Sequence, residues 1–215
     1  MPMILNETEV RVLAALVEKQ LTTPEYYPLT LNALVQACNQ KTNRDPVVNY
    51  DEETVGRAID SLREKNLVYI FHGAGSRVLK YKHLLPEVFE LNFAETALVA
   101  VLMLRGAQTL GELRERASRM YEFSNLSEAE ETLHNLTARE PDNLVIKLPR
   151  QPGQKEIRYT HLLSGEPDLS VFETAPAARI SGSDKIASLE EKIELLSNEI
   201  ADLRQMFEDF RKQFE

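Results

Sequence analysis

The chain has 215 residues, of which 43% are hydrophobic and 27% are charged, and its formal net charge is −9. This composition is typical of a globular protein, and no apolar run approaches the length of a membrane span. The single cysteine, Cys38, excludes an intrachain disulfide and a cysteine-based metal cluster. Because the first residues lack the basic and apolar regions of a signal peptide, we expect a cytoplasmic protein without membrane contact.

The charge is distributed unevenly along the chain. Residues 1–86 carry ten basic and ten acidic side chains, residues 87–163 carry nine and twelve, and residues 164–215 carry six and twelve. Neither of the first two segments has the basic excess that dominates affinity for a phosphate backbone.

Apolar residues at helical spacing predict three helices in the first part of the chain, at about 6–19, 30–38 and 51–65. Asn6 is suited to cap the first helix, with Glu9 as its capping-box partner. Cys38 ends the apolar face of the second helix, a position that favours a buried thiol over a reactive one.

Residues 67–85 read as two short strands joined by a Gly-Ala-Gly-Ser turn, which predicts a β-hairpin. The pattern recurs at 144–163, and both segments open with Leu-Val and close with Tyr-Xaa-His-Leu-Leu. Because side chains alternate across a strand, we expect alternate residues of each second strand to form a buried face. These are Leu79, Tyr81 and His83 in the first hairpin and Ile157, Tyr159 and His161 in the second.

The helices before the first hairpin recur as well. Residues 86–90 read as a link short enough for two units to pack together, and an apolar helix follows at about 94–104. Thr109 is suited to cap the next helix, with Glu112 at the capping-box position, and a third helix is expected at about 127–138.

Three helices followed by a hairpin describe a winged helix-turn-helix, and here the unit is used twice. The predicted fold class is therefore mainly α with small β-hairpins (α+β), as two tandem winged helix-turn-helix domains plus a C-terminal helix. The expected boundaries are 1–86 and 87–163 for the domains, 164–183 for a Pro/Gly/Ser/Ala-rich flexible linker and 184–215 for an amphipathic helix.

Apolar residues of the C-terminal segment recur at alternating steps of three and four, the heptad pattern of a coiled coil. They are Ile186, Leu189, Ile193, Leu196, Ile200, Leu203, Phe207 and Phe210. Isoleucine at the a positions and leucine at the d positions favour a parallel dimer, so we expect a homodimer formed by this helix. The alternative is that the apolar stripe folds back onto the chain's own domains.

Residues 39–48 are polar, without apolar periodicity, and read as a long loop between the second and third helices. Lys41, Asn43 and Arg44 are candidates for contact with a phosphate or an acidic peptide. Equally, the Asn and Asp side chains of this loop can simply close turns on their own backbone.

Two further groups of basic residues are candidate binding sites. Arg114, Arg116 and Arg119 follow Thr109 on the expected helix and form the densest basic cluster, although a solvated face interleaved with glutamates is the commoner explanation. The two hairpins, which form the wings of the expected domains, are also basic. Their candidate phosphate contacts are Arg77, Lys80, Lys82, Arg150, Lys155 and Arg158.

Several runs resemble the bacterial YceH family of uncharacterised proteins. They include Ala-Cys-Asn-Gln-Lys-Thr-Asn-Arg-Asp-Pro-Val at 37–47, Leu-Arg-Gly-Ala-Gln-Thr at 104–109 and Arg-Met-Tyr-Glu-Phe at 119–123. The resemblance spans residues 4–163. It implies a tandem winged-helix protein with a predicted coiled coil, and it implies no catalytic residues.

The chain contains no P-loop, dinucleotide fingerprint, nucleophile elbow or zinc spacing, so we expect no enzyme, cofactor or small-molecule substrate. The expected third helices, at 51–65 and 127–138, both begin with carboxylates, and these repel the phosphates of a nucleic acid. We therefore favour a dimeric adaptor that acts through protein–protein contacts. The alternative is a DNA-binding regulator that contacts phosphates through its basic wings.

Overall fold

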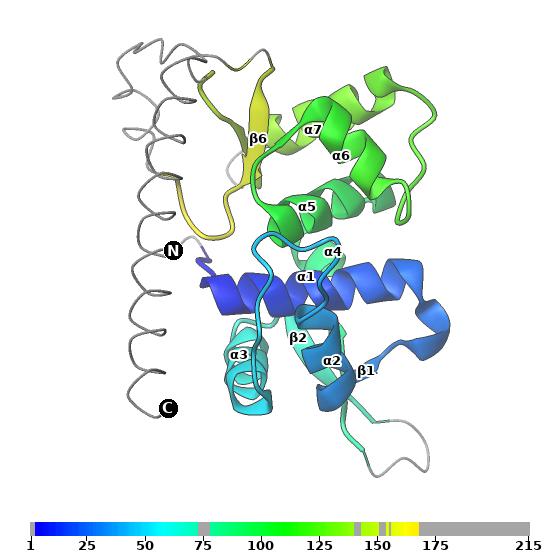
Figure 1. Cartoon of the computed structure of the whole chain (residues 1–215), viewed down its shortest axis with the longest axis vertical. Coiled ribbons are helices and arrows are strands. Elements are labelled where there is room, and N and C mark those ends of the chain that lie inside the picture. The colour runs from blue at the N-terminus through cyan, green and yellow to red at the C-terminus, as the bar shows by residue number, and fades with distance from the viewer. Residues whose placement is uncertain (1–2, 73–77, 140–142, 151–153, 155, 168–215) are drawn as a thin grey trace, which may run out of the picture. The chain divides into compact units, whose positions relative to one another are not determined.

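The computed structural model describes residues 3–72, 78–139, 143–150, 154 and 156–167. The described residues belong to one compact unit that lies within residues 1–174. They form helices and two three-stranded antiparallel sheets, so the fold is of the mixed α+β class (Figure 1). The expected C-terminal helix at 184–215, with its dimer contacts, and nearly all of the expected linker lie outside the described residues.

The first repeat contains the three predicted helices, and the ends of each lie within three residues of the prediction. Its elements are α1 (Glu7–Thr22), the 3-10 turn η1 (Pro24–Tyr26), β1 (Leu29–Thr30), α2 (Leu31–Cys38), α3 (Glu52–Glu64), β2 (Val68–Phe71) and β3 (Lys80–His83). The predicted capping box is confirmed: Oδ1 of Asn6 accepts from the Glu9 N–H at 2.9 Å, and Oε2 of Glu9 accepts from the Asn6 N–H at 2.7 Å.

The second repeat has the same order of helices and strands. Its elements are α5 (Phe93–Arg105), β4 (Gln108–Thr109), α6 (Leu110–Ala117), α7 (Leu126–Ala138), β5 (Val145–Lys147) and β6 (Arg158–His161). Thr109 and Glu112 form the predicted capping box of α6. The expected link at 86–90 is instead largely helical, as α4 (Leu85–Phe89), because Pro86 falls in its first turn, where no N–H is needed.

Each sheet contains one strand more than the predicted hairpin. The strand orders are β1-β3-β2 and β4-β6-β5, with all neighbours antiparallel. In the first sheet Tyr81 pairs with Leu29 on one side and Ile70 on the other, and in the second Tyr159 pairs with Gln108 and Lys147. The tyrosine of each repeated motif therefore lies on the middle strand of its sheet.

The expected buried face of the hairpins is only partly correct. His83 is buried and Tyr81 is partly buried, but Leu79 lies before β3 and is 46% exposed, beyond the part of the hairpin that helices cover. In the second hairpin Ile157, Tyr159 and His161 are all partly buried.

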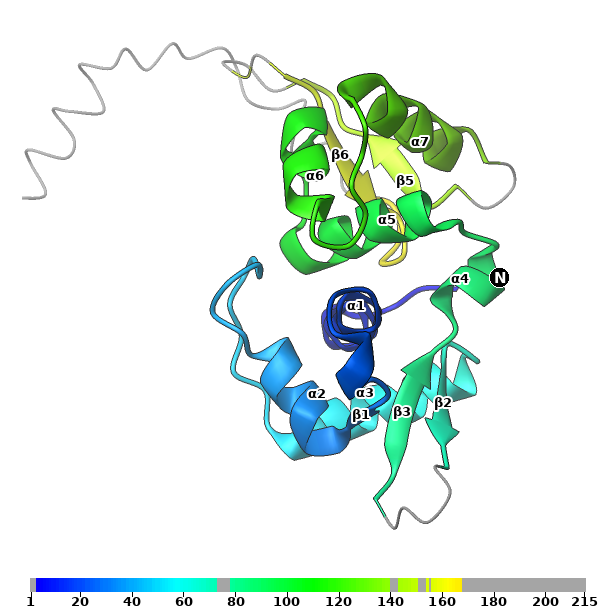
Figure 2. The same cartoon turned by 90° about the vertical axis from the view of Figure 1, so that its right-hand side faces the viewer.

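The middle of helix α1 is buried all round because it packs on both repeats. It contacts α2 and α3 on one side and α5 on the other, and Figure 2 shows it end-on between them. Every residue from 9 to 18 is buried, including the charged Glu9, Arg11 and Glu18. Burial of ionised groups requires partners, and the partners of Glu18 define the candidate site.

Candidate functional site at the junction of the repeats

The two repeats meet where α1 packs against α5 (Figure 2). Backbone hydrogen bonds cross the same junction, from the Asp45 N–H to the Leu104 carbonyl at 2.9 Å and from the Leu5 N–H to the Leu163 carbonyl at 2.7 Å. The end of α1, the 39–48 loop and the ends of α5 and α6 are thereby brought to one place.

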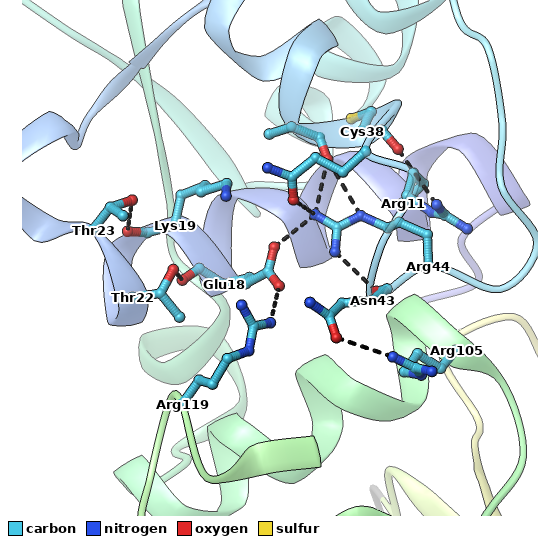
Figure 3. Close-up of polar contacts among 12 residues, drawn as sticks. Arg11, Glu18, Lys19, Thr22, Thr23, Cys38, Asn43, Arg44, Arg105 and Arg119 are labelled. Carbon is cyan, nitrogen blue, oxygen red and sulfur yellow. Dashed lines mark hydrogen bonds and ion pairs between the residues drawn. The ribbon is translucent and has the colours of Figure 1, made fainter.

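One buried carboxylate joins the repeats at this place. Glu18 is 1% exposed; its Oε2 accepts from Nη2 of Arg44 at 2.6 Å and its Oε1 accepts from Nη2 of Arg119 at 2.8 Å (Figure 3). Arg44 belongs to the first repeat and Arg119 to the second. We call Glu18, Lys19, Asn43, Arg44, Arg105 and Arg119 the Glu18 cluster.

Arg44 is engaged on all sides by its own repeat. Its Nε and Nη2 donate to the Ala37 carbonyl at 3.2 and 2.8 Å, its Nη1 donates to the Asn43 carbonyl at 3.0 Å, and the residue is 5% exposed. The guanidinium of Arg44 is therefore not presented to a ligand. The contacts of Arg44 agree with the alternative in which the polar side chains of the 39–48 loop brace the chain's own backbone.

The same loop reaches the second repeat through Asn43. Asn43 has a φ of 57°, and its Oδ1 accepts from Nη1 of Arg105 at 3.1 Å. At the other end of the loop, Nη2 of Arg11 donates to the Pro46 carbonyl at 2.7 Å. Hydrogen bonds from Arg11 on α1 and Arg105 on α5 therefore connect the loop to both helices.

Positive charge exceeds negative charge around the cluster. Glu112 pairs with Arg116 at 3.4 Å and with Arg158 at 3.2 Å. Including this group, six cations (Lys19, Arg44, Arg105, Arg116, Arg119 and Arg158) lie among three carboxylates (Glu18, Asp45 and Glu112). The junction is locally cationic in a chain whose net charge is −9.

The protonation of the cluster follows from this imbalance. Burial alone would raise the pKa of Glu18, but the hydrogen bond and charge of Arg44, the charge of Lys19 and the hydrogen bond of Arg119 hold that pKa below its ordinary value. The pKa of Lys19 is lowered, first by burial and also by Arg44 and Arg119, against the attraction of Glu18. Burial and the charge of Arg116 likewise lower the pKa of Arg105.

Three of the predicted candidate groups thus contribute to the junction. Asn43 and Arg44 come from the loop, Arg116 and Arg119 from the basic group, and Arg158 from the second wing. Arg119 lies beyond the end of α6 rather than on it as predicted, because α6 ends at Ala117. Lys41 and Arg114 are exposed to solvent.

The remaining wing residues lie elsewhere. Lys80 and Lys82 are partly buried on β3, and the ammonium of Lys82 lies 5.9 Å from the ring centroid of Tyr69. Arg150 is exposed beyond β5. Arg77 and Lys155 lie outside the described residues.

Sequence reasoning assigned no site role to Glu18, Lys19, Arg105 or Arg11. Arg11 and Glu18 flank the apolar run of residues 12–17 on α1, but a buried charge and an exposed one look alike in a single sequence. The partner Arg119 lies 101 residues away from Glu18 along the chain.

In the described part of the chain, no group of three or more His, Cys, Asp and Glu side chains is arranged to hold a metal ion. None of the helices described in the structure is long and apolar enough to span a membrane.

Comparison with known proteins places the chain in a bacterial family. A family model described as "Protein of unknown function, DUF480" matches residues 5–154. The chain is 60% identical over 173 residues to a UPF0502 protein of Opitutus terrae, covering 80% of this chain and 75% of the relative. It is 51% identical over 221 residues to a UPF0502 protein of Geotalea uraniireducens, covering all of both chains.

The chain is also similar to the UPF0502 protein YceH of Salmonella schwarzengrund, with 46% identity over 205 residues, 94% of this chain and 93% of the relative. The resemblance expected from the sequence is thereby confirmed. With a family model that covers well over half of its length, this chain belongs to the DUF480 family of proteins of unknown function.

Proposed function

We propose that this chain is a non-catalytic, dimeric tandem winged-helix adaptor that acts through protein–protein contacts. The winged-helix interpretation is supported by the repeated order of the elements. In each repeat a long helix, a two-residue strand and two further helices precede a hairpin whose second strand pairs with that short strand. This is the order of a winged helix-turn-helix.

One observation carries the adaptor proposal: the surface that would meet DNA in the first repeat is acidic and apolar. In DNA-binding relatives of this motif the start of the third helix enters the major groove. Here Asp51, Glu52 and Glu53 stand exposed at the start of α3. At the far end of the hairpin, Phe71 is 40% exposed and Leu79 46% exposed.

Carboxylates at this position repel a phosphate backbone, whereas exposed apolar side chains next to polar ones are typical of protein-binding surfaces. Val78, which is 59% exposed, extends the apolar end of the hairpin. The charged side chains of α3 offset one another in part, with Arg57 3.8 Å from Glu53 and Arg63 3.1 Å from Asp60. The helix carries more carboxylates than arginines and therefore offers no net positive charge to phosphates.

The alternative, a DNA-binding regulator, relies on the wings. A DNA-binding regulator would use Arg158 to contact phosphate. Here Nη1 of Arg158 donates to the Ala107 carbonyl at 2.8 Å and pairs with Glu112. Winged-helix folds bind either DNA or proteins, so the choice between the two functions depends on the exposed residues and not on the fold. The dimer of the proposal rests on the heptad pattern of residues 186–210 in the sequence.

Site-specific photocrosslinking in bacterial cells tests the adaptor proposal. A benzophenone side chain is introduced at Leu79 in the full chain and, as a control, at Arg57 on α3. We expect residue 79 to form a protease-sensitive, nuclease-resistant adduct of defined mass that residue 57 does not form. A nuclease-sensitive adduct at residue 79 would contradict the proposal and favour the regulator.

A further inference from the structure

The charge surplus of the Glu18 cluster is exposed on one side. Arg119 donates from one Nη to Glu18, yet its side chain is 48% exposed, so part of its fork of donors is accessible to solvent. Lys19 is partly buried next to it on the last turn of α1. In the described residues, no hydrogen bond or ion pair is formed by the Lys19 ammonium.

From this geometry we infer that Lys19 and Arg119, with Arg105 and Arg116 beside them, bind carboxylate side chains of an acidic segment of a partner protein. This inference rests on the proposed adaptor function, because it names the chemistry of the partner. Guanidinium forks suit carboxylates, and a bidentate pair is stronger and more directional than a contact with a single charge.

The buried part of the cluster keeps these cations in place. Glu18 is already shared by Arg44 and Arg119, so it does not neutralise Lys19 as well. Arg105 is held by Asn43 through Nη1, while its buried Nε meets no acceptor among the described residues. Burial, and after it the neighbouring arginines, lower the pKa values of Lys19 and Arg105.

An acidic peptide fits this site better than a nucleic acid does. A short peptide covers only the junction, whereas a duplex extends over neighbouring surface. That surface includes the exposed carboxylates of Glu115 on α6 and of Glu122, three positions after Arg119 in the chain. A chain with a net charge of −9 repels a long polyanion more strongly than a short one.

The test uses fluorescein-labelled decaglutamate as the probe, titrated with the full chain at low ionic strength and followed by anisotropy. We expect saturable binding that Lys19→Gln and Arg119→Gln each weaken by about fivefold or more, because each removes one cation that the site presents to the probe. Arg57→Gln makes the same charge change on α3 and should alter the affinity by less than about twofold. Arg119→Lys, which keeps the charge but removes the fork, should bind more weakly than the unmodified chain and more tightly than Arg119→Gln.

Lys19→Gln removes no hydrogen bond of the described structure, so it carries the test even if Arg119→Gln unfolds. Absence of binding by the unmodified chain, or equal weakening by Arg57→Gln, would overturn the carboxylate site and leave the adaptor proposal standing. Displacement of the probe by a random-sequence duplex at equal charge concentration would assign the cations to phosphate and overturn the inference. The adaptor proposal is tested separately by photocrosslinking, where a nuclease-sensitive adduct at residue 79 would contradict it.

Discussion

Glu18 is the residue on which the junction of the two repeats depends. Its carboxylate is 1% exposed and accepts charged hydrogen bonds from Arg44 and Arg119, two arginines separated by 75 positions in the chain. Removing one partner of a buried ion pair leaves the other charge without compensation, which is more costly than exchanging both for apolar groups.

We predict that Glu18→Gln lowers the free energy of unfolding by about 3 to 5 kcal/mol, because Arg44 is left buried with its charge uncompensated. Urea unfolding followed by circular dichroism measures the effect. Glu25→Gln, an exposed matched control in η1, should change the stability by less than about 0.5 kcal/mol. Glu18→Gln combined with Arg44→Met should recover part of the loss, and an effect of Glu18→Gln no larger than that of the control would contradict the role of the cluster.

Glu18 should also account for part of the loss of folding stability at acid pH. Since the folded pKa of Glu18 lies below its ordinary value of 4.5, Glu18 contributes stability above that pH, and the contribution is lost as the pH falls through the folded pKa. The unmodified chain should therefore lose more stability than Glu18→Gln when the pH is lowered from about 5 to 3. Parallel pH profiles of the two proteins would contradict this.

The repeated histidines are structural groups of the sheets. Burial lowers the pKa of His83 to about 3 and that of His161 to about 4, and Nδ1 of His83 accepts from the Leu85 N–H at 3.3 Å. We predict that the ring resonances of both histidines stay unchanged from about pH 8 to pH 5 in an NMR titration. A titration of either ring with a midpoint near pH 6.5 would show a solvated histidine and contradict the structure.

At the scale of elements, α1 and α5, the first helices of the two repeats, begin with the same capping box. Oδ1 of Asn92 accepts from the Glu95 N–H at 2.9 Å, and Oδ1 of Asn6 accepts from Glu9 at the same distance. We predict that Asn6→Ala and Asn92→Ala each lower the unfolding free energy by about 1 kcal/mol, measured by urea titration. Asn49→Ala, at an exposed position of the loop before α3, is the matched control and should be neutral.

Helices were predictable from the sequence because their signals are local. Caps such as Asn6 and Thr109 and the apolar spacing between them define the helix limits within a few residues. The short strands β1 and β4 were not predictable, since each exists only by pairing with a strand about 50 residues later. For the candidate site, the polar loop and the basic group stood out, whereas their meeting on Glu18 depends on the packing of α1 on α5.

For the whole molecule, dimerisation is a prediction from the tail sequence alone. Ile193 and Ile200 stand at successive a positions of the heptad pattern. We predict that Ile193→Asp with Ile200→Asp converts a dimer into monomers in analytical ultracentrifugation, because unpaired charges are not tolerated in a coiled-coil seam. Glu191→Asp with Glu199→Asp, outside the a and d positions, is the control. A variant that remains dimeric would place the interface elsewhere.

The central claim for the whole molecule is that it binds proteins rather than DNA. The exposed start of α3 is acidic, the end of its hairpin is apolar, and Arg158 of the second wing is occupied by Glu112. The most direct test is the anisotropy of a labelled random-sequence duplex titrated with the full chain at two salt concentrations. We predict no binding even at low salt; submicromolar binding that weakens steeply with salt would contradict the claim and establish phosphate contacts.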